Sequence, residues 1–224
     1  MVARRYRRVF ARRRRPYRRS GAYRRRRRPL KRLTKAGRGN FRFKFTRVVS
    51  ITQNLALSQI HDLSFEPSDF EEFFNLAANF EAYKFTRLRV RVLPQQNVSN
   101  NSSSLIGDYC LIPWHRGVPT KSKFDDYVSV DKAKIFRGTK CGSMSFVPST
   151  LNDVQYSTNK TIQSNVVYRP RIEITTADSM EITHYTGLMA MQALTDAPTD
   201  SKAHYNIVYD AWCTFINQTT LKKY

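Results

Sequence analysis

The sequence predicts an all-β fold, a two-sheet sandwich or jelly roll with long loops, preceded by a disordered basic arm. Three observations predict it. About seven short strand-like segments follow residue 40, and polar connections of up to about 20 residues separate them. Only one short segment between them has a helical pattern. The alternation of strands and helices that is typical of a parallel sheet does not appear.

The first 39 residues form the polycationic arm. Residues 1–47 contain 22 Lys and Arg and no Asp or Glu, whereas the other 177 residues carry 17 basic and 17 acidic side chains. The net charge of +22 therefore comes from the N-terminal fifth of the chain. Pro16, Gly21 and Pro29 interrupt any helix there, and repulsion between arginines four residues apart opposes one further. We expect residues 1–39 to be disordered when free, and residues 40–224 to form one domain.

The arm has the composition of a protein segment that binds single-stranded nucleic acid. Arginine binds phosphate through two parallel hydrogen bonds and stacks on flat rings. Aromatic side chains placed between the arginines can stack on exposed bases. Alternatively, the aromatic residues are only spacers. Nothing in the arm reads base edges in a fixed geometry, so we expect sequence-independent binding. The residues expected to bind are Arg4, Arg5, Arg7, Arg8, Arg12, Arg13, Arg14, Arg15, Arg18 and Arg19, with Tyr6, Phe10, Tyr17 and Tyr23.

The second half of the arm also resembles a nuclear localisation signal. On an extended backbone each basic side chain can pair with a carboxylate in the acidic groove of an import receptor. The same side chains bind phosphate, so we expect receptor and nucleic acid to compete for them. The residues best suited to this role are Arg24, Arg25, Arg26, Arg27, Arg28, Lys31, Arg32 and Lys35.

The body opens with an alternating segment, FRFKFTRVVSIT, at residues 41–52. Phe41, Phe43 and Phe45 fall on one face of the predicted strand. The alternation of apolar and polar residues is interrupted at residues 47–49, where we expect a β-bulge.

One short helix is expected next. Ser68 and Glu71 have the spacing of a capping box, and the acids around them favour the start of a helix. The apolar face of this helix would consist of Phe70, Phe73, Phe74 and Ala77.

The clearest strand is YKFTRLRVRVLP, at residues 83–94. Its apolar residues alternate with Arg87, Arg89 and Arg91, which would form a row on one face with about 6.6 Å between neighbours. The row is expected to bind nucleic acid or a neighbouring subunit. The alternative is a solvent-facing side whose charges pair with Glu81 or Glu173 on neighbouring strands.

The remaining strand-like segments are GDYCLIPW, GSMSFVPS, VVYRPRIEITT, EITHYTGLMAMQAL and HYNIVYDAWCTFI. The last of them is half apolar on its second face, so we expect it to be covered on both sides. Loops as long as residues 115–134 are uncommon in compact domains, and contact between subunits is one reason for them. Trp114, Tyr127, Phe136 and Tyr156 either anchor such contacts or pack under their own loops.

No arrangement of residues that catalysis requires is apparent, so we expect no enzyme, no metal and no cofactor. His61, His115, His184 and His204 match no catalytic or metal-binding motif, and His184 is expected to be a core or interface residue. The three cysteines are scattered along the chain, and we expect them to be buried thiols. The longest apolar run is far below the roughly 20 residues of a membrane span, so no membrane insertion is expected.

Several segments together resemble the circovirus family of capsid proteins. They are the arginine-rich start, FRFKFTRVVSIT, FEAYKFTRLRVRVLP, DDYVSVD ahead of a strand, and the closing HYNIVYDAWCTFI. Phe80, Glu81, Tyr83 and Pro94 match an F-E-x-Y strand that ends at proline, and the closing strand matches its counterpart only partly. The chain fits the cyclovirus branch at least as well as the circovirus branch.

The resemblance implies a viral jelly roll of eight antiparallel strands. About sixty copies would close a T=1 icosahedral shell around circular single-stranded DNA, with the arms inside. It also implies a virion protein that visits the host nucleus through an import receptor, and attachment to cell-surface glycosaminoglycan without assigned residues. Sixty chains at +22 would balance about 1,300 phosphates, which is the scale of a very small genome. The competing hypothesis is a basic-tailed RNA-binding or ribosomal protein.

Overall fold

The computed structural model describes residues 39–95, 106–117, 119–155, 162–197 and 201–219 of the chain. All of them belong to one compact unit that starts at Gly37. The nucleic-acid and nuclear-localisation residues predicted in the arm, and also Tyr156, lie outside the described residues.

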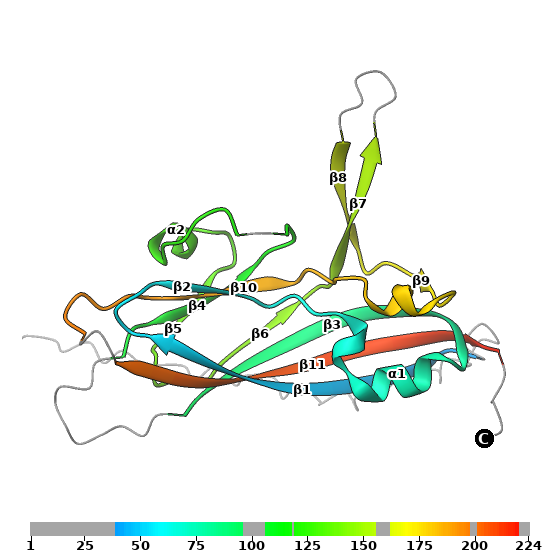
Figure 1. Ribbon diagram of the computed structural model, residues 1–224, viewed down its shortest axis with the longest axis horizontal. Coiled ribbons are helices and arrows are strands. Elements are labelled where there is room, and N and C mark those ends of the chain that lie inside the picture. Colours follow the sequence, from blue (N-terminus) through cyan, green and yellow to red (C-terminus); the bar gives the residue numbers. More distant parts are fainter. Residues whose placement is uncertain (1–38, 96–105, 118, 156–161, 198–200, 220–224) are drawn as a thin grey trace, which may run out of the picture. The chain divides into compact units, whose positions relative to one another are not determined.

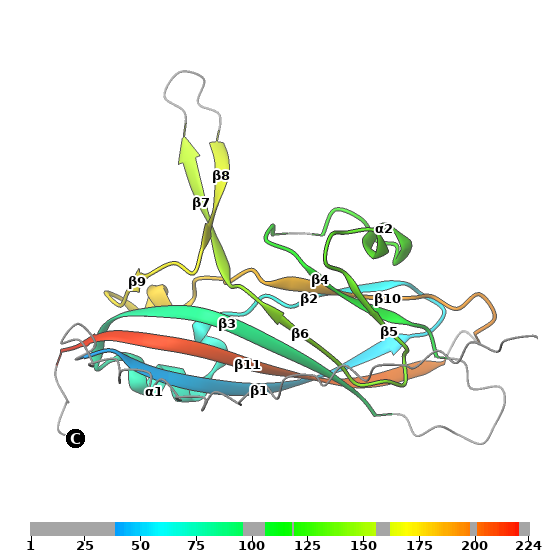
Figure 2. The same cartoon turned by 180° about the vertical axis from the view of Figure 1, so that it is seen from behind.

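The first sheet is antiparallel and has the strand order β1-β11-β3-β6, with β9 paired to a further part of β3 (Figure 1, Figure 2). Its strands are β1 (Phe41–Asn54), β11 (Lys202–Gln218), β3 (Phe80–Pro94), β6 (Gly142–Phe146) and β9 (Ile172–Glu173). The last strand of the chain, β11, thus lies between the first and the third.

The second sheet is also antiparallel and has the order β2-β10-β4-β5. Its strands are β2 (Gln59–Asp62), β10 (Gly187–Met191), β4 (Tyr109–Pro113) and β5 (Lys134–Phe136). The chain crosses from the first sheet to the second and back along β1, β2, β3 and β4, as in a jelly roll. The two four-stranded paths give the eight strands of the predicted sandwich, so this fold class is confirmed.

A hairpin outside the two sheets was not predicted. It consists of β7 (Ser149–Gln155) and β8 (Ile162–Tyr168), and it projects beyond the second sheet (Figure 1, Figure 2). Reciprocal backbone hydrogen bonds of 3.0 and 2.8 Å between Ser149 and Tyr185 hold its base. The predicted single strand at residues 166–176 is divided, because Arg169 has a φ of 52° and Pro170 follows it.

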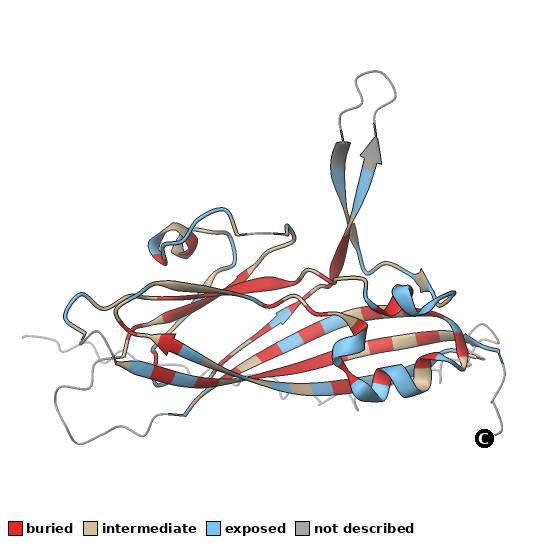
Figure 3. Cartoon of the chain, in the orientation of Figure 1, coloured by how far each residue is buried: buried red, intermediate tan, exposed pale blue. Residues whose placement is uncertain are grey.

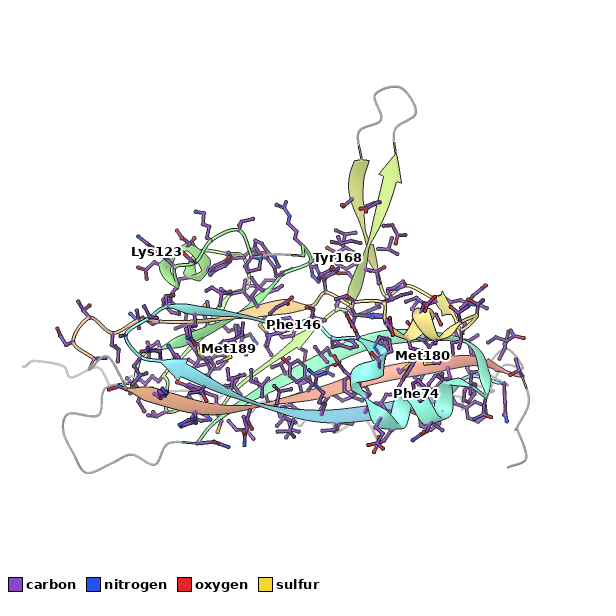
Figure 4. All side chains as sticks on the ribbon, in the orientation of Figure 1. Phe74, Lys123, Phe146, Tyr168, Met180 and Met189 are labelled. Carbon is purple, nitrogen blue, oxygen red and sulfur yellow. The ribbon has the colours of Figure 1, made fainter. Side chains whose placement is uncertain are left out.

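The main core lies between the two sheets. Buried residues alternate along most of β3, as a sheet with one covered face requires (Figure 3). Residues 207–211 of β11 are all buried, so this middle part of the strand is covered on both sides, as expected, whereas its two ends are not. Phe146 of β6 and Met189 of β10 belong to this core (Figure 4). Phe73 closes one end of it, with its ring 5.1 Å from that of Phe215.

The predicted bulge at residues 47–49 is wrong. β1 pairs with β11 without interruption, from Phe41 opposite Phe215 to Asn54 opposite Lys202. Arg47 takes an inward position in this register, where it forms a salt bridge with Asp69 and lies over the ring of Tyr209. Val48 consequently points outward and is 58% exposed. A charged residue thus occupies an apolar position of the alternation without any change of register.

A bulge does occur on β3. Arg87 lies opposite Trp212 and Phe85 lies opposite Cys213, so Thr86 is the extra residue. It falls at the start of the arginine row.

The helical segments are η2 (Pro67–Asp69), α1 (Glu71–Ala77), α2 (Asp125–Val128) and η3 (Ala177–Met180). The predicted capping box is displaced, because Glu66 and Asp69 form it at the start of η2. Phe73 and Ala77 are buried as predicted, but Phe74 is 56% exposed. No helix in the described ranges is long and apolar enough to cross a membrane.

The second helix, α2, covers the outer face of the second sheet. Ile112 of β4 and Leu188 of β10 pack on that face against Phe124 and Tyr127. The main core covers the other face of this sheet, so β4 and β10 are buried on both faces. This explains their uninterrupted apolar sequences, YCLIP and GLMAM.

The aromatic residues of the long loops that are described pack within their own chain. The rings of Trp114 and Tyr127 are 5.8 Å apart, and those of Phe136 and Tyr109 are 5.4 Å apart. These residues thus pack within their own chain, and their contact with neighbouring subunits stays a prediction.

Candidate nucleic-acid interface

The outward side of the first sheet carries a concentration of positive charge. Strand alternation buries Leu88, Val90 and Val92 completely and turns the arginines of β3 outward. The basic side chains of β1 join them on the same side. We call this surface the cationic face, and it consists of Arg42, Lys44, Arg87, Arg89 and Arg91.

One acid is embedded in the cationic face. Asp210 of β11 is 3% exposed and forms salt bridges of 2.7 Å with Lys44 and 3.1 Å with Arg91. Thr46 donates a hydrogen bond of 2.9 Å to the same carboxylate. Burial raises the pKa of Asp210, but the bonds from Lys44 and Thr46 and the charge of Arg91 outweigh it, so the pKa is lowered. The carboxylate is therefore ionised at neutral pH.

The other two arginines of the row have neutral partners. Arg89 donates to the hydroxyl of Ser143 at 3.0 Å, and Arg87 donates to that of Ser145 at 2.6 Å. A hydroxyl orients a guanidinium without cancelling its charge. The predicted alternative of acidic partners therefore holds for Arg91 alone, through Asp210 rather than through an acid of β9.

Sequence reasoning missed Trp212 as a functional residue. Its ring lies between two cations of neighbouring strands, with the Arg87 Cζ 5.0 Å and the Lys44 Nζ 5.8 Å from the ring centre. The signal was present, because the alternation of β11 puts this aromatic residue on the outward face. Strand pairing was needed to show which charges lie beside it.

The histidine expected in the core is there. His184 is fully buried, with Nδ1 2.8 Å from the carbonyl oxygen of Ile182 and its ring stacked on Phe65. Burial lowers its pKa to about 4, so the ring is neutral. The described residues contain no cluster of three potential metal ligands.

The fold is that of jelly-roll capsid proteins, and it resembles two crystal structures of the BFDV capsid protein. The 60-mer has a TM-score of 0.62 at 13% identity over 83% of this chain and 97% of the other. The decamer has a TM-score of 0.56 at 12% identity over 79% and 99%.

The chain belongs to the circovirus capsid protein family, whose model matches residues 4–219. It is 51% identical over 192 residues to the capsid protein of Human associated cyclovirus 1, which covers 84% of this chain and 87% of that protein. The predicted family is thereby confirmed. The protein is a structural component of a virion and not an enzyme, and the ribosomal alternative is wrong.

Proposed function

We propose that this capsid protein assembles into a T=1 icosahedral shell of about sixty copies that packages circular single-stranded DNA through its N-terminal arm. The division of charge is the observation that carries the proposal. All of the excess positive charge precedes residue 48, and the remainder of the chain is neutral. Neutral bodies can approach one another without net repulsion, whereas the arms need a polyanion to offset their positive charge. The 60-mer of the BFDV capsid protein supports the copy number.

The cationic face supplies a second, ordered contact with the packaged strand. Arg87 and Arg89 form no salt bridge with any described residue there, because their hydrogen-bond partners are the hydroxyls of Ser145 and Ser143. Arg91 contributes less, because it shares the carboxylate of Asp210 with Lys44. The contact would therefore be strongest at the Arg87 end of the row.

The arm has a further role as a nuclear localisation signal. Residues 24–35 carry its densest basic run, which suits both an import receptor and phosphate. DNA bound in the shell would then mask the signal in the host nucleus. Attachment of the particle to cell-surface glycosaminoglycan would use other basic surfaces of the body.

Substitution of the arm in the full-length chain tests packaging. Replacing the ten arginines Arg4, Arg5, Arg7, Arg8, Arg12, Arg13, Arg14, Arg15, Arg18 and Arg19 by Gln should leave particle formation intact and remove most of the nucleic acid. Replacing the same ten by Lys is the matched control, which keeps the charge and should keep most of the cargo. Electron microscopy and the ratio of absorbance at nucleic-acid and protein wavelengths report the two properties. Particles of the Gln variant that hold as much nucleic acid as the wild type would contradict the proposal.

A further inference from the structure

A cavity lies in the first sheet at the bulge on β3. Thr86 is the extra residue in the register of β3 with β11, and its hydroxyl donates a hydrogen bond of 3.2 Å to the carbonyl oxygen of Trp212. The cavity has a volume of about 330 Å³. Its lining consists of Arg42, Phe43, Thr86, Arg87, Trp212, Cys213 and Thr214.

The cavity combines a flat aromatic surface with positive charge. Trp212 forms one wall and is half-buried, so part of its indole is accessible. Arg42 and Arg87 line the same cavity and are exposed. None of the residues lining it is acidic. Arg87 also lies over the indole, at 5.0 Å from the ring centre.

Two neighbours fix this arrangement. Ser145 holds the guanidinium of Arg87 through a hydrogen bond of 2.6 Å. Lys44, on the other side of the indole, is held by its 2.7 Å salt bridge with Asp210. Because Arg87 and Lys44 both lie over the indole in the free protein, a base that stacks on Trp212 must first displace the Arg87 guanidinium, which stays beside the ring and can then contact phosphate.

We propose that this cavity is a nucleotide subsite for the packaged strand, in which one base stacks on Trp212 and the adjacent phosphates contact Arg42 and Arg87. Base stacking on an aromatic side chain with arginines on the backbone is how proteins bind single strands without reading their sequence. Only two residues separate Arg42 from the arm, which ends at residue 39. A DNA strand that is bound to the end of the arm is therefore within reach of Arg42. The inference rests on the proposed packaging function and assigns to it a fixed site on the body.

Oligonucleotides with and without bases separate stacking from phosphate binding. Full-length protein is titrated with a thymidine oligonucleotide and with an abasic oligonucleotide of the same length, and tryptophan fluorescence and affinity are measured. The base-bearing strand should quench the fluorescence, and the abasic strand should quench it far less. In Trp212→Leu the quenching should disappear while Trp114 still emits, and the preference for the base-bearing strand should fall about 5-fold or more. Val48→Ala, on the same face of the sheet, should behave as the wild type.

Three outcomes would overturn the inference. Quenching that persists in Trp212→Leu would assign the signal to Trp114. Equal quenching by both oligonucleotides would show that no base reaches the indole. Heparin binding that depends on Trp212 when thymidine binding does not would assign the cavity to a sulfated glycan. In all three cases the arm-substitution experiment still decides packaging, whereas a wild type that binds no oligonucleotide overturns both proposals.

Discussion

Arg91 on β3 and Asp210 on β11 form an ion pair across neighbouring strands, with Nη2 and Oδ2 3.1 Å apart. The carboxylate is buried and also serves Lys44 of β1. One acid thereby links three strands of the first sheet. It also divides the arginine row into one member with a salt bridge, Arg91, and two members that hydrogen-bond to serine hydroxyls.

Replacing Asp210 by Asn should destabilise the body. The substitution removes the charge that Lys44 and Arg91 share and leaves the hydroxyl of Thr46 with a weaker acceptor. Both cations are partly exposed and can be rehydrated, so we expect a loss of about 1–3 kcal/mol in the free energy of unfolding. Denaturant titration measures it, and Asp126→Asn, at an exposed ion pair with Lys121, should cost far less. Equal effects of the two substitutions would refute the structural role of Asp210.

The arginine row should act unevenly on nucleic acid. Arg87→Gln combined with Arg89→Gln should lower the affinity of the full-length protein for single-stranded DNA. The slope of log K against log salt should become shallower by about 1.4, at about 0.7 for each lost phosphate contact. Arg91→Gln should change this slope less and the unfolding free energy more. A larger slope change for Arg91→Gln would contradict this division.

His184 should make the body sensitive to acid. Its pKa is about 4 when folded against 6.5 when exposed, so between these values the unfolded chain binds a proton that the folded chain excludes. Stability therefore falls as the pH drops from 6.5 to about 4, by roughly 3 kcal/mol in total. Unfolding measured across this range should show the slope, and His184→Leu should reduce it; burial also lowers the pKa of His61 and His115, so part of the slope should remain.

Gly187 should not tolerate a side chain. A Cβ atom there would lie 2.5 Å from the carbonyl oxygen of Ile112 and 2.5 Å from the ring of Phe146. Gly187→Ala is expected to lower stability by about 1–3 kcal/mol, because the neighbouring strand cannot move away without breaking pairs. Gly117→Ala is the control, since its nearest neighbour would be Tyr185 at 3.8 Å. Thermal unfolding of both variants checks the difference, and equal melting temperatures would contradict it.

The nuclear-localisation role is testable outside the particle. A fluorescent reporter fused to residues 1–39 should enter the nucleus, and a version with Arg24–Arg28 changed to Ala should not. Single-stranded DNA should displace an import receptor from the same segment, because both bind the same side chains. A reporter that stays in the cytoplasm with the intact arm would refute the signal. A receptor that DNA cannot displace would refute the competition.

Local pattern was enough to predict the sandwich and the direction of the arginine row. Leu88, Val90 and Val92 are large and apolar at every second position, and a sheet with one buried face has no other way to place them. Arg47 shows where pattern fails. In the sequence, a charged residue at an inward position suggests that the alternation has shifted by one residue. In the structure, Asp69 of η2 and the ring of Tyr209, both distant from Arg47 in sequence, are its partners there.

The candidate interface needed the strand order. Ser143 and Ser145 are unremarkable in the sequence, yet β6 brings them beside Arg89 and Arg87. Trp212 likewise becomes a candidate only when β1 and β3 are placed on either side of β11. The location of the bulge at Thr86 depends on pairing between strands more than 120 residues apart, which local alternation does not encode.

The central position of β11 has a consequence for biosynthesis. Among the described residues β11 is the only partner of β1, and it supplies one complete edge of β3, so the first sheet cannot close before residues 202–218 have left the ribosome. Pairs such as Phe41 with Phe215 span nearly the whole body, and such non-local pairing makes folding slow. Until β11 is available, β1 and one edge of β3 lack their partner strand, and a chain in this state has no complete first sheet to bring to a shell.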